Sequence, residues 1–306
     1  MAVSVALAAD AALGEPAIDP HPVAAFGTVM ERLEARCYAD RRSRGLAHCL
    51  AGVGLGATAG AVIGSTGLTA YLAVAGRALS DEALAVAALL AGDDLDAARH
   101  RLPALVGRDT GGLDAGEISR AVIESVAENT VDAVVAPALW ALVAGAPGAL
   151  AYRAINTLDA MVGHRSDRYL RFGWASAKAD DAAGWLPARL TALLVACVRP
   201  TAAARVWRAV RVQAPAHPSP NAGVAEAAFA AALGRRLGGT NVYGYRIEER
   251  PALGEGPPAS VADISRAAAL SRDVVAFLAL LLTAPSLARA ARCRHNGNAR
   301  RGWADG

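Results

Sequence analysis

The chain has 306 residues, of which 54% are hydrophobic and only 19% are charged, and its net charge is +3. Soluble globular proteins carry about 25% charged residues, so this composition indicates a membrane protein with substantial polar loops. Such a small net charge gives no reason to expect nucleic acid as a partner. The four cysteines form no CxxC pair and have no histidine at metal-ligand spacing, so we expect neither a zinc site nor a disulfide framework.

Residues 1–45 begin with an apolar stretch, pass through a proline-rich turn and end in a predicted amphipathic helix. The apolar stretch, residues 1–9, is too short to cross a bilayer by itself. Three prolines between residues 16 and 22 exclude a helix in the turn. The amphipathic helix is expected over residues 24–45, and its end is basic.

Residues 46–76 form a run of 31 residues without Asp, Glu, Lys or Arg. One membrane span needs about 20 apolar residues. The run is therefore either one long tilted helix or a hairpin broken near Gly64–Gly67, and a main span with a flanking helix is favoured. Residues 77–105 return to soluble character and predict a helix that leads into the loop around Arg108 and Asp109.

Residues 114–132 predict a helix with an acidic stripe. Asp114 is the expected N-cap, and Glu117, three residues later, is placed to close a capping box. Three carboxylates then follow at i, i+4 and i+8 on one face, opposite an apolar face: Glu124, Glu128 and Asp132. The stripe is either a solvated surface or a binding site. The site is favoured, because carboxylates at a membrane border are poorly placed unless a cation or substrate uses them.

The uncharged segment 133–152 follows directly and is interrupted at Pro137 and at Gly145–Gly148. It is able to cross the membrane as a kinked helix or to turn back as a re-entrant hairpin, which is allowed only where protein or water covers the backbone. A re-entrant or shallow segment is favoured, because it keeps the polar loops on both sides at one face of the membrane.

The remaining chain alternates polar loops with apolar segments. Residues 153–189 predict a polar surface loop rich in candidate site groups, and only one of the adjacent Asp180 and Asp181 is expected to point into a site. Residues 224–233 predict an Ala-rich helix capped by Asn221, and residues 234–260 a Gly/Pro-rich loop. The last apolar segment, 274–288, precedes a basic tail, which the positive-inside rule places in the cytoplasm.

Several sequence blocks occur together in one order along nearly the whole chain. They are Asp10 to Pro16 with His21–Val23, Val106–Thr110, Glu124–Asp132 with Pro137, Asn156–Asp159 with Met161–Gly163, Asp180 with Asp181, Trp185–Arg189, His217–Gly223 and Leu237–Gly239. This set resembles the membrane-bound CobD/CbiB family, the adenosylcobinamide-phosphate synthases. Gly184 stands where the family pattern has Asn, and His164 stands where it has Tyr.

The resemblance implies an all-α, polytopic integral membrane protein with helical cytoplasmic loops, formed by a single domain over residues 1–306. It implies a multi-pass protein of the cell membrane whose active site faces the cytoplasm. The implied reaction is the ATP-dependent ligation of a propionate of adenosylcobyric acid to aminopropanol or its phosphate. The expected partners are this corrinoid, the small amino alcohol and membrane lipid. A non-enzymatic membrane carrier or transporter of corrinoids is the alternative, and the oligomeric state is left open.

Residue types suggest roles within this reaction. Activation of a carboxylate by ATP needs Mg²⁺ held by one or two carboxylates and phosphate oxygens. The predicted catalytic residues are Glu128, Glu124, Asp132 and Asp109, of which Glu124, Glu128 and Asp132 are the predicted metal ligands and Glu128 is the suggested general base. The predicted substrate- or phosphate-binding residues are Arg108, Asn129, Asn156, Asp159, Asp181, Arg189, His217 and Asn221. We expect most of these groups to converge on one pocket.

Overall fold

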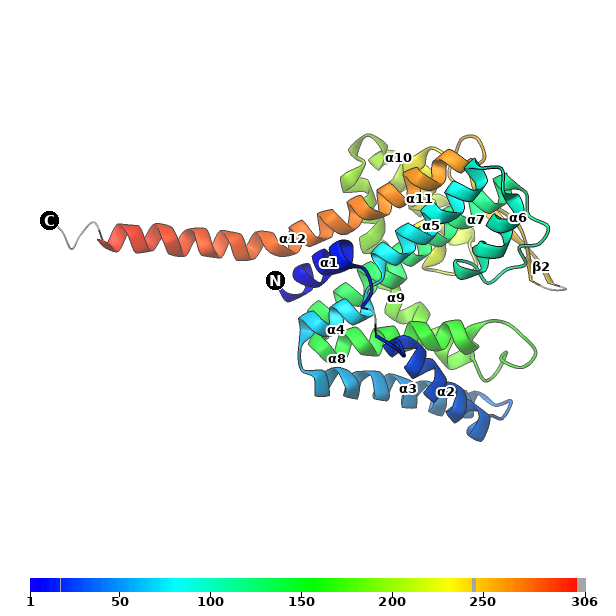
Figure 1. Ribbon diagram of the computed structural model, residues 1–306, viewed down its shortest axis with the longest axis horizontal. Helices are drawn as coiled ribbons and strands as arrows, with labels where there is room; N and C mark the ends of the chain where they lie inside the picture. The colour runs from blue at the N-terminus through cyan, green and yellow to red at the C-terminus, as the bar shows by residue number, and fades with distance from the viewer. Residues whose placement is uncertain (17, 244–245, 302–306) are drawn as a thin grey trace.

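The computed structural model describes the backbone of residues 1–16, 18–243 and 246–301, and the side chains of these residues up to 284 except that of residue 246. The described part is almost entirely helical (Figure 1). Its elements are α1 (Ala2–Leu13), α2 (Pro22–Cys37), α3 (Arg42–Ile63), α4 (Thr66–Ala73), α5 (Gly76–Ala91), α6 (Leu95–Arg101), η1 (Leu102–Ala104), α7 (Ala115–Thr130), η2 (Val131–Val135), α8 (Ala136–Leu158), η3 (Asp159–Gly163), α9 (Trp174–Val198), η4 (Pro200–Ala202), α10 (Ala203–Val212), η5 (Ala214–Ala216), α11 (Ala222–Leu233), β1 (Leu237–Tyr243), β2 (Arg246–Leu253) and α12 (Val261–Arg301).

The helices α7 and α11 lie at the centre of the bundle. Val122 and Val126 on α7 and Phe229 on α11 have no exposed surface. α7 packs against α5, α11 and α12, while α8 packs against α3, α4 and α9. Half of the buried residues of α11 are alanines, which allow close approach of the neighbouring helices. Figure 1 shows α12 leaving this body and extending well beyond it.

Four helical segments are long and apolar enough to cross a membrane: Arg42–Ile63, Ala115–Gly163, Trp174–Val198 and Val261–Ala284. In Arg42–Ile63, only 28% of the most apolar 18-residue stretch is buried against protein, and Leu50 and Val62 are exposed. Exposed apolar surface of this extent requires lipid to cover it. The predicted all-α polytopic membrane fold is confirmed, with the addition of one small β-hairpin.

The long segment Ala115–Gly163 is a helical hairpin rather than one straight helix. Gly145 has a positive φ of 63° with ψ −148°, and this non-helical conformation interrupts α8. The Tyr152 hydroxyl donates a hydrogen bond of 3.3 Å to Asp132 Oδ1, although 20 residues of continuous helix would separate these positions by about 30 Å. The chain therefore reverses at Gly145, as the favoured re-entrant reading of the sequence requires.

Each arm of this hairpin contains one π-helical turn. α7 is α-helical only to Thr130, and η2 then carries Asp132, while η3 begins at Asp159. π-turns inside helices are frequent at functional sites. The capping box predicted for the start of α7 is present: Asp114 Oδ1 accepts from the Glu117 backbone at 2.8 Å, and Glu117 Oε2 accepts from the Asp114 backbone at 2.9 Å.

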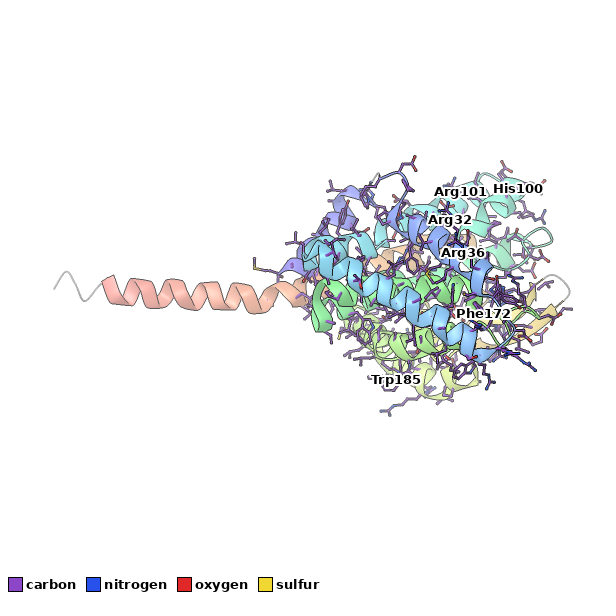
Figure 2. The ribbon with its side chains drawn as sticks, turned by 90° about the horizontal axis from the view of Figure 1, so that it is seen from below. Arg32, Arg36, His100, Arg101, Phe172 and Trp185 are labelled. Carbon is purple, nitrogen blue, oxygen red and sulfur yellow. The ribbon has the colours of Figure 1, made fainter. Side chains whose placement is uncertain are left out.

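The first predicted helix is wrong in its extent. Instead of one helix over residues 24–45, α2 ends at Cys37 and α3 begins at Arg42. Tyr38 between them has extended backbone angles (φ −58°, ψ 130°). Its hydroxyl donates to the Arg168 carbonyl at 2.8 Å, and its ring packs against Phe172, which is labelled in Figure 2. The break expected near Gly64 is present, with Gly64 left-handed at φ 69° and Ser65 capping α4.

Two predicted loops prove to be regular structure. The stretch predicted as a loop over residues 153–189 is helical up to Gly163 and again from Trp174 onward, so Asp180, Asp181 and Arg189 lie on α9. Residues 234–260 contain the antiparallel hairpin β1–β2, in which Thr240 pairs with Glu249. The basic tail predicted to face the cytoplasm begins at Arg289 and lies outside the described side chains.

Candidate functional site

An inner cavity of about 120 Å³ lies between α7, α11, the β-hairpin and the loop that precedes α7. Four of the predicted site residues line it: Arg108, Glu124, Glu128 and His217. Ser125, Glu226, Asn241, Tyr243 and Arg250 complete its polar lining, and none of these five is among the site residues predicted from the sequence. The cavity is thus walled by charged side chains from elements far apart in the chain.

Glu124 is fully engaged in holding this wall together. Its Oε2 accepts from Arg108 Nη2 at 2.6 Å, and its Oε1 accepts from the Gly238 backbone at 3.0 Å. Arg108 also donates to the Asn241 side chain. Because Glu124 and Arg108 are both buried and paired, Glu124 fixes β1 onto α7 rather than presenting a free carboxylate.

The β-hairpin is further anchored by backbone acceptors. Arg120 on α7 donates to the Gly238 carbonyl at 3.0 Å and to the Thr240 carbonyl at 2.8 Å. The Asp109 backbone donates to the Val242 carbonyl at 2.9 Å. Gly238 has a φ of 85°, and a Cβ there would lie 2.9 Å from the Pro251 carbonyl carbon, so glycine is required at this close approach. These contacts position Asn241 and Tyr243 at the cavity.

Glu128 and Glu226 form a pair of hydrogen-bonded carboxyl groups inside the cavity. Glu226 projects from the otherwise apolar helix α11 and is only 5% exposed. Burial raises the pKa of Glu226 well above its usual range, and the neighbouring charge of Glu128 raises it further. Two carboxyl groups in this setting need a shared proton or a bound cation.

His217 connects this pair to Arg250. Its Nε2 lies 2.9 Å from Arg250 Nη1 and 3.6 Å from Glu226 Oε1. Burial lowers the pKa of His217, so the ring is neutral and Nε2 accepts a hydrogen bond from the arginine. Nδ1 then carries the proton and donates to the Ser219 carbonyl at 3.1 Å. The histidine therefore orients Arg250 at the mouth of the cavity.

An outer cleft of about 1480 Å³ adjoins the inner cavity. Three residues line both spaces: Gly107, Tyr243 and Arg250. Arg165 also lines the cleft, so the loops before α7 and after η3 meet at one end of the bundle. The cleft's basic groups are Arg42, Arg165, Arg171, Lys178 and Arg250, and its acidic groups are Asp159, Asp180, Asp181, Glu248 and Glu249.

The acidic floor of the cleft connects to the inner cavity through the helical hairpin. Asp180 interacts electrostatically with Asp159 and Glu128, and its carboxylate is hydrogen-bonded to the predicted site residue Asn156. Asp132 interacts with the same groups. Both members of the Asp180–Asp181 pair line the cleft, which contradicts the expectation that only one would face a site. The reason is the width of the cleft, which accommodates positions 100° apart on α9.

Several predicted site residues have other contacts. Asn129 donates to the Ser125 carbonyl at 3.0 Å, and Asp109 lines neither space. Arg189 donates to Asn221 Oδ1 at 3.2 Å, and Asn221 Nδ2 donates to the Asp181 carbonyl at 2.9 Å. Asn221 makes no side-chain cap on α11. It occupies the space beside Gly184, where a Cβ would lie 2.7 Å from Asn221 Nδ2.

The acidic groups differ in how they suit a metal ion. Among the described side chains, no three His, Cys, Asp or Glu residues form a ready metal-binding cluster, and the predicted ligands Glu124, Glu128 and Asp132 have separate partners. Asp180 at the wall of the cleft has a buried Oδ1 without a hydrogen-bond partner, and Asp159 stands close to it. This arrangement fits Mg²⁺ delivered with a nucleotide, because Mg²⁺ commonly uses one or two carboxylates together with phosphate oxygens.

Comparison with known proteins places this site in a family. Residues 3–271 match the family model described as CobD/Cbib protein. A cobalamin biosynthesis protein CobD from Mycobacterium tuberculosis is 45% identical over 288 residues, which cover 89% of this chain and 91% of the relative. Its counterpart from Geobacter metallireducens is 43% identical over 272 residues, which cover 83% and 86% of the two chains. The one from Halalkalibacterium halodurans is 40% identical over 302 residues, with 92% and 95% covered.

No solved structure matches the chain. The family model covers most of the sequence, including the inner cavity and the outer cleft, and the relatives align over nearly their full lengths. The chain belongs to the CobD/CbiB family of cobalamin biosynthesis proteins.

Proposed function

We propose that this protein is an ATP-dependent ligase that joins a propionate carboxylate of adenosylcobyric acid to aminopropanol or its phosphate ester. The observation that carries the proposal is the pair of adjoining spaces, one small and acidic and one very large, within a member of this family. A ligase of this kind must bring a small amine and a bulky corrinoid to one point. Gly107, Tyr243 and Arg250, which line both spaces, mark that point.

The reaction has two chemical steps. The terminal phosphoryl group of ATP is transferred to a propionate oxygen, which gives an acyl phosphate and ADP. The amine nitrogen then attacks the acyl carbon, so that a C–N bond forms, the C–O bond breaks and inorganic phosphate leaves. Glu128 accepts the proton that the amine loses, because it lines the inner cavity and, unlike Glu124, is not held in an ion pair with Arg108.

The charges of the outer cleft suit an activated acyl group and a nucleotide. Arg250 stands at the junction of the two spaces, and Arg165 and Lys178 lie in the cleft wall. Guanidinium groups bind phosphate oxygens through paired hydrogen bonds. When bound with the nucleotide, Mg²⁺ would be held by Asp159 and Asp180 and would neutralise charge on the phosphates. We place this open end of the protein in the cytoplasm, where ATP is available.

The test is ligation by the purified protein in detergent. We expect Mg²⁺-ATP to be converted to ADP and phosphate only when a corrinoid acid and an amine are both present, with the amide product identified by mass spectrometry. Aminopropanol and its phosphate ester, assayed in parallel, identify the amine that is used. Corrinoid binding without ATP consumption or amide formation would instead support a carrier.

A further inference from the structure

We propose that the inner cavity is the amine subsite and that Glu226 binds the substrate ammonium together with Glu128. This placement rests on the proposed ligation and assigns its two organic substrates to separate spaces. Glu226, which was not among the site residues predicted from the sequence, thereby gains a role in binding. The corrinoid then occupies the outer cleft, and the amide bond forms at the junction beside Arg250.

Size separates the two substrates. Binding sites for drug-sized ligands usually have volumes of about 300–1,000 Å³. The inner cavity, at about 120 Å³, is far smaller and has room for about four water molecules. The outer cleft, at about 1480 Å³, exceeds the usual range. A small amino alcohol fits the first space, whereas a corrinoid and a nucleotide fit only the second.

Charge selects the ammonium end of the small substrate. Glu128 and Glu226 face each other across a hydrogen bond, and Glu226 is buried on a helix that is otherwise apolar. An ammonium group has three donors and no acceptor, so it satisfies two adjacent carboxylates at once. The third carboxylate, Glu124, is already bound by Arg108 and the Gly238 backbone and is not available for this role.

The other polar groups orient the substrate toward the cleft. Arg108 is held by Glu124 and Asn241, which leaves Arg250 as the cation at the open side. Its Nη1 contacts His217, its Nη2 contacts Glu248 at 3.0 Å, and its Nε is buried without a hydrogen-bond partner. An anionic group that arrives from the cleft would therefore meet Arg250, while the ammonium stays with the carboxylates behind it.

The first experiment compares steady-state kinetics of the wild type with those of Glu226→Gln. Loss of a charge-assisted hydrogen bond weakens binding by about 10- to 100-fold. We expect the KM for the amine to rise by that factor, while the KM values for the corrinoid acid and ATP stay within about twofold. Glu226→Asp, which keeps the charge, should recover part of the affinity. The matched control is Glu255→Gln, because Glu255 is exposed and pairs only weakly with Arg208 at 3.9 Å.

A second experiment needs no variant and so does not depend on folding of a mutant. Inhibition of the wild type by amines without the hydroxyl group is compared with inhibition by 1,2-propanediol, which lacks the ammonium. We expect the amines to compete with the substrate amine and the diol to have no effect. Absence of ligation in the wild type would overturn the proposed function itself. Normal ligation with an unchanged amine KM in Glu226→Gln, or competition by the diol, would overturn only this subsite.

Discussion

The inner cavity and the outer cleft share three lining residues, yet they are built in different ways. The cavity is closed by buried pairs, and the side chains of Arg108 and Glu124 are 6% and 9% exposed. In the cleft, Lys178 and Asp181 form a pair whose side chains are 62% and 31% exposed. Buried charges are costly when a partner is lost, whereas exposed charges exchange partners with water. The difference predicts that the side chains of the inner cavity hold fixed positions, whereas those of the outer cleft adapt to the ligand.

The largest effect is expected from Glu124→Ala, which removes one partner of the buried pair. Arg108 would remain as an uncompensated buried charge, and the loss should be about 3–5 kcal/mol in the free energy of unfolding. Thermal and denaturant unfolding in detergent measures this. The matched control is Glu82→Ala, which breaks the more exposed pair with Arg101 and should cost no more than about 1 kcal/mol. Equal losses in the two variants would remove the contrast between a rigid cavity and the surface.

Glu128→Gln is expected to abolish turnover while the protein stays folded. The substitution keeps the size of the side chain but removes the group that accepts the amine proton, which should lower the rate about 100-fold or more. Amide formation at saturating Mg²⁺-ATP measures it, beside a thermal melt. Glu117→Gln is the control on the same helix, because glutamine also closes a capping box. Near-normal turnover in Glu128→Gln would move the proton acceptor elsewhere, to Glu226 or to the cleft.

The cavity and the cleft also differ in how far they could be predicted from the sequence. Local signals defined α7 well: Asp114 and Glu117 form the capping box, and helical spacing placed Glu124 and Glu128 on one face. Gly145 and Pro147 indicated where the chain reverses, because glycine tolerates a positive φ and proline interrupts the hydrogen bonds of a helix. These features depend on neighbours in sequence, which is why they were visible.

Glu226, Asn241 and Arg250 reach the cavity only through tertiary contacts. A useful signal existed for Glu226, since a single carboxylate in the apolar stretch 222–233 must find a partner when buried. The hairpin was harder to predict, because its glycines suggest a loop and its anchors, Arg120 and Glu124, lie more than 100 positions earlier. For the same reason, sequence alone could not show that Arg189 and Asn221 bind each other.

Gly145→Ala tests the reversal that brings the cavity and the cleft together. Alanine at φ 63°, ψ −148°, a conformation almost restricted to glycine, costs about 1–3 kcal/mol. We expect the free energy of unfolding to fall by this amount, and turnover of the folded protein to fall less than in Glu128→Gln. Unfolding experiments in detergent measure the first quantity. Gly54→Ala is the control, because its Cβ would meet no atom within 4 Å and alanine favours the interior of α3. An unchanged or raised stability in Gly145→Ala would contradict the positive φ at this turn.

The smallest effect is expected at the outer cleft, for Lys178→Met. Its ion pair with Asp181 is solvent-exposed, so stability should change by less than about 1 kcal/mol. The lost positive charge weakens attraction of the nucleotide, and we expect the KM for Mg²⁺-ATP to rise at most about fivefold in low salt. The rise should shrink at high salt, because the screening length falls from about 10 Å at 0.1 M to about 3 Å at 1 M. Arg208→Met, at an exposed position outside the cleft, should leave the KM unchanged. If Lys178→Met instead lowers turnover at every salt concentration, its ammonium contacts the reacting groups directly, and the cleft shares the rigid character of the cavity.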